Sequence, residues 1–258
     1  MQIHYRDEGI GPTLLLLHGS NSSLHTWEGW VNELKSSFRL ISLDLPGHGL
    51  TGPHPHHDYS METYIGILKN FTDRLSLERF SLAGNSFGGR VAWEFTLAYP
   101  NMIEKLILVC SSGYPSPLPR LYRLARNPLL KGFFNFITPK KIIENGIKNA
   151  YGDPTKVTPR LVEQYFELLL RVGNRRAMVA HMNKDEQWHH EEIKKISVPT
   201  LILWGEKDRL IPVRLSKRFH ENIKGSKLII YPGVGHLPME EIPEKSAADA
   251  KGFLFKRS

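Results

Sequence analysis

Short runs of consecutive apolar residues recur along the chain, with turn residues and stretches of helical spacing between them. The apolar runs are residues 13–17, 38–43, 80–83, 105–110, 200–204 and 227–231, and an alternating segment at 2–6 precedes them. Runs of this length without polar interruption are typical of strands that are covered on both faces. The segments with helical spacing are 26–34, 60–75, 90–99, 212–223 and 243–255. This alternation predicts an α/β fold, with a mostly parallel sheet and helices on both of its faces.

The alternation of strands and helices stops between Ser111 and Lys194. Prolines at 115, 117 and 119 mark the boundary, and helical segments without a convincing strand follow. These segments are 121–126, 129–136, 140–149, 159–172 and 175–183. We therefore expect a core made of residues 1–110 and 196–258, and a helical cap, residues 111–195, inserted after the sixth strand.

Composition places the chain among soluble globular proteins. Of its 258 residues 41% are apolar and 23% are charged, and no apolar stretch reaches the length of a membrane span. The first residues, MQIHYRDEG, lack the apolar segment of a signal peptide. Cys110 is the only cysteine, which suits a reducing compartment, and it ends an apolar run, so we expect it in the core. We expect a cytoplasmic protein without stable membrane insertion.

The net charge of +8 is concentrated in the predicted cap. Residues 111–195 hold 15 Lys and Arg against 8 Asp and Glu. A basic surface can serve anionic substrates, a membrane surface or nucleic acid. No nucleic-acid motif accompanies the charge, so the pattern favours a solvated basic face and no nucleic-acid partner.

The stretch 80–89, FSLAGNSFGG, has the pattern of a nucleophile elbow. An apolar run leads into Gly84-Asn85-Ser86-Phe87-Gly88, and a segment with helical spacing follows. A G-x-S-x-G sequence between a strand and a helix places its serine at the tip of a sharp turn. The two glycines relieve the clashes that bulkier residues would cause in that turn. Ser86 is therefore the candidate nucleophile.

A base and an orienting acid follow two later strands. Asp208 comes after the run 200–204 and His236 after 227–231, while Glu206 competes with Asp208 in the same loop. The carboxyl ends of parallel strands lie at one edge of a sheet, so Ser86, Asp208 and His236 should meet there. A serine hydroxyl needs such a base, and the base needs an acid that orients it. The order Ser, Asp, His is the order expected on this fold.

Acyl transfer also needs two backbone donors for the oxyanion. The N–H of Phe87, just after the nucleophile, supplies one. The loop after 13–17 supplies the other, with Ser20 the first candidate and Asn21 the second, and His18 is expected to be a structural hydrogen-bonding residue. Two histidine-containing stretches, 54–58 and 188–192, lack the spacing of a metal site, so no metal and no cofactor are expected.

The motifs together resemble the α/β-hydrolase superfamily, in particular its cap-bearing serine hydrolases. The matching pieces are LLLLHGS, LDLPGHG, LAGNSFGGRVAW, ILWGEKDRLIP and GVGHLPMEE. GNSFGG is also similar to the elbow of the meta-cleavage-product hydrolases, which cleave C–C bonds. Those enzymes use a cap arginine, for which Arg175 and Arg176 are candidates. They place an aromatic residue after the catalytic histidine, where this chain has Leu237.

The leading hypothesis is a carboxylesterase-like serine hydrolase of the class EC 3.1.1 that acts on small-molecule esters with an apolar moiety. Two alternatives stay open. One is C–C bond hydrolysis of a meta-cleavage product, and the other is a ligand receptor built on a hydrolase scaffold. Fold and motif do not fix a substrate. No oligomeric state follows from the sequence.

Overall fold

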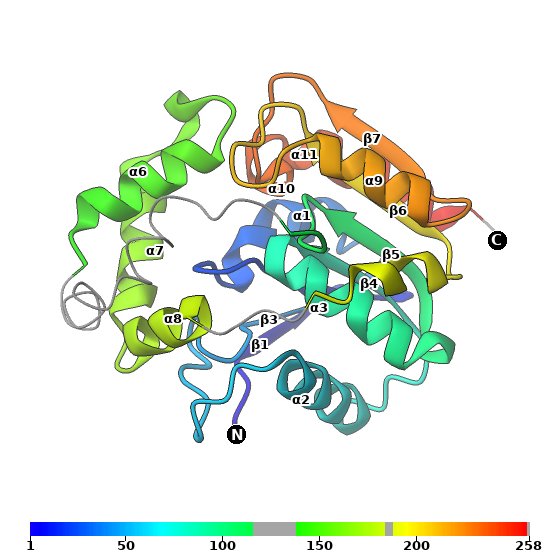
Figure 1. The fold of residues 1–258 in the computed structure, drawn as a ribbon, viewed down its shortest axis with the longest axis horizontal. Helices are drawn as coiled ribbons and strands as arrows, with labels where there is room; N and C mark the ends of the chain where they lie inside the picture. The colour runs from blue at the N-terminus through cyan, green and yellow to red at the C-terminus, as the bar shows by residue number, and fades with distance from the viewer. Residues whose placement is uncertain (116–137, 184–187, 257–258) are drawn as a thin grey trace.

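A seven-stranded sheet runs through the protein (Figure 1). The structure is a computed structural model, and it describes residues 1–115, 138–183 and 188–256. Its strand order is β1-β3-β2-β4-β5-β6-β7, and all neighbouring strands are parallel except β1, which is antiparallel to β3. The strands are β1 (Tyr5–Glu8), β2 (Thr13–Leu17), β3 (Arg39–Leu43), β4 (Phe80–Asn85), β5 (Ile103–Val109), β6 (Thr200–Gly205) and β7 (Lys227–Tyr231). The predicted α/β fold is confirmed. The first strand begins three residues later than the alternation at 2–6 suggested.

Helices cover both faces of the sheet. The α-helices are α1 (Glu28–Leu34), α2 (Met61–Arg74), α3 (Ser86–Ala98), α6 (Lys140–Ala150), α7 (Pro159–Leu170), α8 (Asn174–Asn183), α9 (Arg214–Asn222), α10 (Pro238–Glu241) and α11 (Pro243–Phe255). The 3-10 helices are η1 (Leu24–Trp27), η2 (Pro100–Met102), η3 (Pro154–Lys156) and η4 (His190–Lys195). On one face α1 packs against α11, and on the other α2, α3 and α9 pack over the strands.

The run of leucines in β2 shows why this strand is apolar throughout. Leu15 and Leu17 join the apolar cluster beneath α2, α3 and α9, whereas Leu14 and Leu16 join the cluster beneath α1 and α11. Successive side chains of a strand point to opposite faces, so a strand covered on both sides must be apolar at every position.

Helix α2 begins where its cap was expected. The Ser60 hydroxyl accepts a hydrogen bond from the N–H of Thr63 at 3.3 Å, which satisfies one of the free donors of the first turn. Helix α10 was not anticipated. It is a single turn, directly after His236, and too short for hydrophobic periodicity to reveal.

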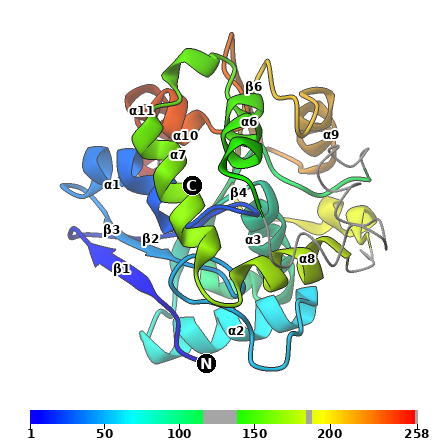
Figure 2. The ribbon, with the colours of Figure 1, turned by 90° about the vertical axis from the view of Figure 1, so that its left-hand side faces the viewer.

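Helices α6, α7 and α8 stand together beside the sheet, and we call residues 138–183 the helical insertion (Figures 1 and 2). The insertion follows β5, so five strands precede it rather than the six that we expected. The helices expected at 121–126 and 129–136 lie outside the described residues. Among the described residues, no helix is long and apolar enough to cross a membrane.

Candidate active site

Ser86 occupies the sharp turn between β4 and α3. Its φ of 53° lies in the left-handed region, which non-glycine residues rarely adopt and which clusters at functional sites. A Cβ on Gly84 would lie 2.3 Å from the carbonyl oxygen of Gly88, and a Cβ on Gly88 would lie 2.4 Å from that of His18. Both positions therefore require glycine. The turn lifts Ser86 to the N-terminus of α3, where free N–H groups favour negative charge.

His236 and Asp208 form a buried pair on the loops after β7 and β6. His236 Nδ1 lies 2.7 Å from Asp208 Oδ2, and the two side chains are 5% and 0% exposed. Asp208 Oδ1 accepts two further hydrogen bonds, from the N–H groups of Leu210 and Ile211 at 2.8 and 2.9 Å. The competing Glu206 is exposed and accepts the N–H of Gly233 instead. The carboxylate of Asp208 keeps the proton on Nδ1, so Nε2 of His236 is free to act as a base.

Asn85 connects the elbow to the histidine loop. Its Nδ2 donates to the carbonyl oxygens of Val109 at 3.1 Å and of His236 at 3.2 Å. The residue before the candidate nucleophile thus fixes the backbone of the candidate base. The sequence marked Asn85 only as a variable position of the motif, because the partner carbonyls lie far away in the chain.

Cys110 lies in the core, as expected, and it is close to Asp208 and His236. Potential ligand atoms of Cys110, Asp208 and His236 lie within 4.8 Å of one another. Burial, and then the charge of Asp208, raise the pKa of the Cys110 thiol well above its ordinary value. A protonated thiol is a poor metal ligand and a poor nucleophile, so neither role is favoured for Cys110.

The loop after β2 carries Ser20 and Asn21 against the elbow. A Cβ on Gly19 would lie 2.8 Å from Asn85 Oδ1 and 3.0 Å from the Cβ of Ser86, so a larger residue would push against the elbow. Phe87 is the second residue of α3, so its N–H has no partner within the helix. Of the two positions expected to supply oxyanion donors, Phe87 thus follows Ser86 directly, and Ser20 follows Gly19, which lies close to Ser86.

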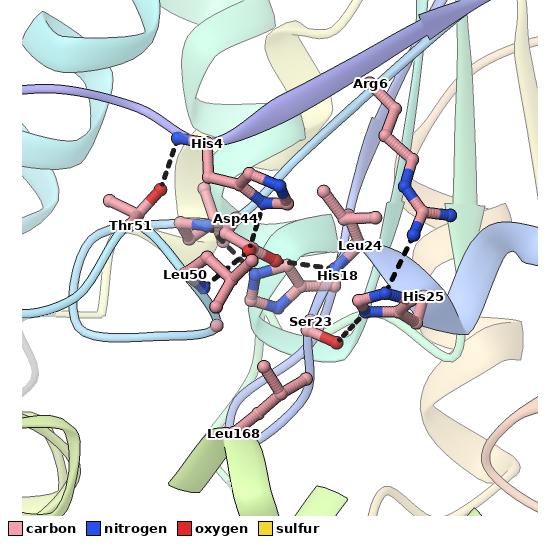
Figure 3. Close-up of polar contacts among 12 residues, drawn as sticks. His4, Arg6, His18, Ser23, Leu24, His25, Asp44, Leu50, Thr51 and Leu168 are labelled. Atoms are coloured by element: carbon pink, nitrogen blue, oxygen red, sulfur yellow. Dashed lines mark hydrogen bonds and ion pairs between the residues drawn. The ribbon is translucent and has the colours of Figure 1, made fainter. Parts of the chain in front are cut away.

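A buried carboxylate, Asp44, bonds to the residue that follows this loop and to the loop after β3 (Figure 3). Asp44 Oδ1 accepts the N–H of Leu24 at 2.8 Å, and Oδ2 lies 2.8 Å from both the N–H of Leu50 and His4 Nδ1. His18 also has both ring nitrogens occupied, because Nδ1 donates to the carbonyl of Gly19 and Nε2 accepts the N–H of Leu45. Burial lowers the pKa of His18, which keeps it neutral in this structural role.

A histidine of the helical insertion reaches the same loop. His181 Nε2 lies 3.2 Å from the Ser20 hydroxyl, and its ring meets the Phe87 ring edge-on at 4.4 Å between centroids. Burial, and then the charge of Arg90, lower the pKa of His181 to about 4, so it is neutral at pH 7. Sequence reasoning missed His181. The available signal was the spacing of Asn174, Ala177, Met178 and His181, which is the inward stripe of one helix.

A second contact joins the helical insertion to the residues just after His236. Glu240 Oε1 accepts the hydroxyls of Thr26 at 2.5 Å and Tyr165 at 2.6 Å, and Oε2 accepts that of Tyr151 at 2.6 Å. Burial raises the pKa of Glu240, while the three hydroxyl donors oppose that rise. We call Glu240, Tyr151, Tyr165 and Thr26 the Glu240 cluster.

Leu237, Arg175 and Arg176, which are candidates for substrate binding, differ in how far their side chains are exposed. Leu237 is 7% exposed and packs in the apolar cluster beneath α1 and α11. On α8, Arg175 is half-buried and Arg176 is exposed, and both have interaction partners. A role in substrate binding stays a prediction for these three residues and for Asn21.

Known proteins resemble this chain over nearly its whole length. An uncharacterized hydrolase of Bacillus subtilis, YugF, is 28% identical over 97% of this chain and 92% of its own. A 2-hydroxy-6-oxo-2,4-heptadienoate hydrolase of Pseudomonas putida is 28% identical over 92% of this chain and 86% of its own. The structure of an esterase from Thermogutta terrifontis superposes with a TM-score of 0.84 at 26% identity, covering 98% of this chain and 92% of that one.

The family model of the alpha/beta hydrolase fold matches residues 12–243. This span includes the elbow, the Asp208–His236 pair and the helical insertion. The chain therefore belongs to the alpha/beta hydrolase family and is a hydrolase of that fold.

Proposed function

We propose that the protein is a serine hydrolase that cleaves carboxylic esters with an apolar moiety through an acyl-enzyme. The observation that carries this proposal is the 2.7 Å contact between Asp208 and His236 Nδ1, at the same sheet edge as the strained Ser86. A base held in the correct tautomer beside an elbow serine is the arrangement that acyl transfer requires.

Each residue then has a defined role. His236 Nε2 takes the proton of the Ser86 hydroxyl, whose oxygen bonds to the ester carbonyl, and the N–H groups of Ser20 and Phe87 stabilise the oxyanion. The C–O bond to the alcohol breaks, and His236 protonates the leaving oxygen. His236 then deprotonates water, which attacks the acyl carbon, and Ser86 leaves with its proton restored. Asp208 stabilises the charged imidazole throughout.

The helical insertion is the proposed cap of this site, inserted between core segments 1–110 and 196–258. Its histidine touches the Ser20 hydroxyl and the Phe87 ring, and its tyrosines hold Glu240. The half-buried apolar side chains of α7, such as Phe166 and Leu169, suit the apolar part of a substrate.

The direct test combines an ester panel with an active-site label. p-Nitrophenyl esters of acyl length two to twelve should be hydrolysed by the wild type, and Ser86→Ala should lose about 10³-fold or more in kcat. A fluorophosphonate should label Ser86 and no other serine. Near-normal turnover by Ser86→Ala contradicts the mechanism, and labelling without turnover of any ester contradicts ester hydrolysis and favours a ligand receptor.

C–C bond hydrolysis is the second candidate, because the Pseudomonas putida relative is a 2-hydroxy-6-oxo-2,4-heptadienoate hydrolase. Half-buried Arg175 is the candidate for the carboxylate of such a substrate. Under this alternative Arg175→Gln loses activity on the dienoate and keeps it on simple esters, and exposed Arg176→Gln is the matched control. Equal losses on both substrates would argue against a carboxylate-binding role.

A further inference from the structure

A small pocket lies between the helical insertion and the loops after β2 and β3. Its polar lining includes Asn21, Ser22, His48, Tyr165 and Asn174, and α7 and α8 contribute the apolar remainder. The open space is about 20 Å³, and a single water-sized group needs roughly 10–15 Å³. The pocket therefore has room for one hydroxyl or one water.

His48, which lines this pocket, has an unused hydrogen-bond acceptor. Its side chain is buried, with the residue only 5% exposed, and Nδ1 donates to the carbonyl of Pro46 at 3.1 Å. Burial and the neighbouring His18 hold the pKa of His48 well below its ordinary value, so the ring is neutral and Nε2 carries a lone pair. Within the described part of the chain, Nε2 has no hydrogen-bond partner.

Asn174, which also lines the pocket, has a second unused acceptor. Its Nδ2 donates to the carbonyls of Gly49 at 2.9 Å and Leu168 at 2.8 Å, which fixes the orientation of the amide. Oδ1 is then an acceptor, the residue is 2% exposed, and no described residue donates to that oxygen. A buried polar atom without a partner is unfavourable. Two acceptors beside one pocket point to a ligand that brings a hydrogen-bond donor.

The place of the pocket in the sheet relates it to the reaction. β4, which leads to Ser86, has β2 and β3 on one side and β5, β6 and β7 on the other. His236 and Asp208 follow β7 and β6, so the leaving alcohol that His236 protonates belongs on that side. The pocket lies on the opposite side, next to the oxyanion loop, where the His48 ring is 5.2 Å from that of His18 and 6.0 Å from that of His181.

We propose that this pocket binds a hydroxyl group on the acyl portion of the ester substrate, which donates to His48 Nε2. The inference rests on the proposed ester hydrolysis and narrows it to esters of hydroxy acids. No acidic residue lines the pocket, so a neutral donor fits and an ammonium group would lose its hydration without a counter-charge.

The test compares matched methyl esters of hexanoic acid. The acyl chain is unsubstituted, or it carries a hydroxyl at carbon 3 or carbon 5. For each hydroxy ester, a matched ester carries a methoxy group at the corresponding carbon. One of the hydroxy esters should exceed both the plain and the methoxy ester in kcat/KM by about tenfold or more, because a site built to bind a hydroxyl discriminates against analogues that lack its donor. Equal rates for all esters mean that the pocket holds a structural water only, which overturns the subsite and leaves ester hydrolysis standing. If no ester is cleaved, both proposals fail.

Two substitutions of His48 identify the acceptor. His48→Asn keeps an amide donor near the Nδ1 position and removes Nε2, whereas His48→Gln puts an amide oxygen near the Nε2 position. The preference for the hydroxy ester, taken as a ratio within each variant, should disappear in His48→Asn and persist in part in His48→Gln. A full preference in His48→Asn overturns the assignment. Melting temperatures report folding, and the comparison of esters by the wild type decides the question if neither variant folds.

Discussion

The sheet edge that carries Ser86 and Asp208 and the helical insertion hold their polar groups in different ways. At this sheet edge, main-chain N–H groups hold Asp208, and glycines at 84 and 88 allow the backbone to close around Ser86. Between the helical insertion and the core, side chains make several of the described contacts, as in the Glu240 cluster and in the His181–Ser20 pair. One main-chain contact joins them as well, because the N–H of His236 donates to the carbonyl of Ala150 at 2.6 Å. Backbone contacts fix the position of chemical groups, whereas side-chain contacts can be exchanged one at a time. Under the proposed function, this difference suits a fixed reaction centre beside a surface that selects substrates.

The largest expected effect is on the acid that orients the base. Asp208→Asn keeps an oxygen for Leu210 and Ile211 but turns an amide N–H toward His236 Nδ1. The imidazole must then accept at Nδ1 and carry its proton on Nε2, so it cannot act as the base, and kcat should fall by about 10³- to 10⁴-fold. Ester kinetics measure the loss, and exposed Glu206→Gln is the matched control. An equal loss in Glu206→Gln would contradict the assignment.

Replacing a glycine by alanine should have opposite effects on stability at the elbow and in the helical insertion. The methyl of Gly88→Ala would meet carbonyl oxygens of Leu17 and His18 at 2.4 Å, so we expect a loss of about 3 kcal/mol or more in the free energy of unfolding. Gly146, inside α6, has nothing within 4 Å of such a methyl, and Gly146→Ala should be stabilising by about 0.5–1 kcal/mol. Urea unfolding measures both. A tolerated Gly88→Ala would show that the elbow can relax.

The Glu240 cluster tests how strongly side chains hold the helical insertion. Glu240→Gln offers amide hydrogens to groups that are themselves donors, so at least one hydroxyl loses its acceptor, at a cost of about 1–3 kcal/mol. Tyr165→Phe removes one donor and should cost less. The exposed Glu244→Gln on α11 is the control. If the stability of Glu240→Gln equalled that of the control, the cluster would not hold the insertion.

The smallest effect is a pH dependence at His181. Its pKa is about 4 in the folded chain and near 6.5 when unfolded. Between these values the unfolded chain binds a proton that the folded chain does not, so the free energy of unfolding falls as the pH decreases from 6.5 to 4. His181→Gln lacks this titrating group. The free energy of unfolding of the wild type, measured by urea titration, should therefore fall relative to that of His181→Gln as the pH decreases from 6.5 to 4. A difference that stays constant with pH would place the folded pKa of His181 near its ordinary value.

Much of the fold was predictable because it is encoded locally. Apolar runs identified every strand after the first, Ser60 identified the start of α2, and Pro243–Phe255 was expected with its observed bounds. Helix α10 was not foreseen, because one turn has no periodicity. The partners of His48, Asn174 and His181 were not foreseen, since they lie far from them in the chain, although helical spacing could have marked His181 as part of an inward stripe.

The sequence by itself determined the alternating strands and helices and the glycine-flanked Ser86. Parallel topology then requires Ser86, Asp208 and His236 to follow strands at one edge, because all those strands end there. Only the tertiary structure decided that Asp208 rather than Glu206 pairs with His236, and that Asn85 holds the histidine loop. It alone brought His48 and Asn174, each with an unpartnered acceptor, into the lining of one pocket beside the loop after β2. Local patterns fix the backbone, whereas burial and pairing of individual side chains depend on which distant segments pack together.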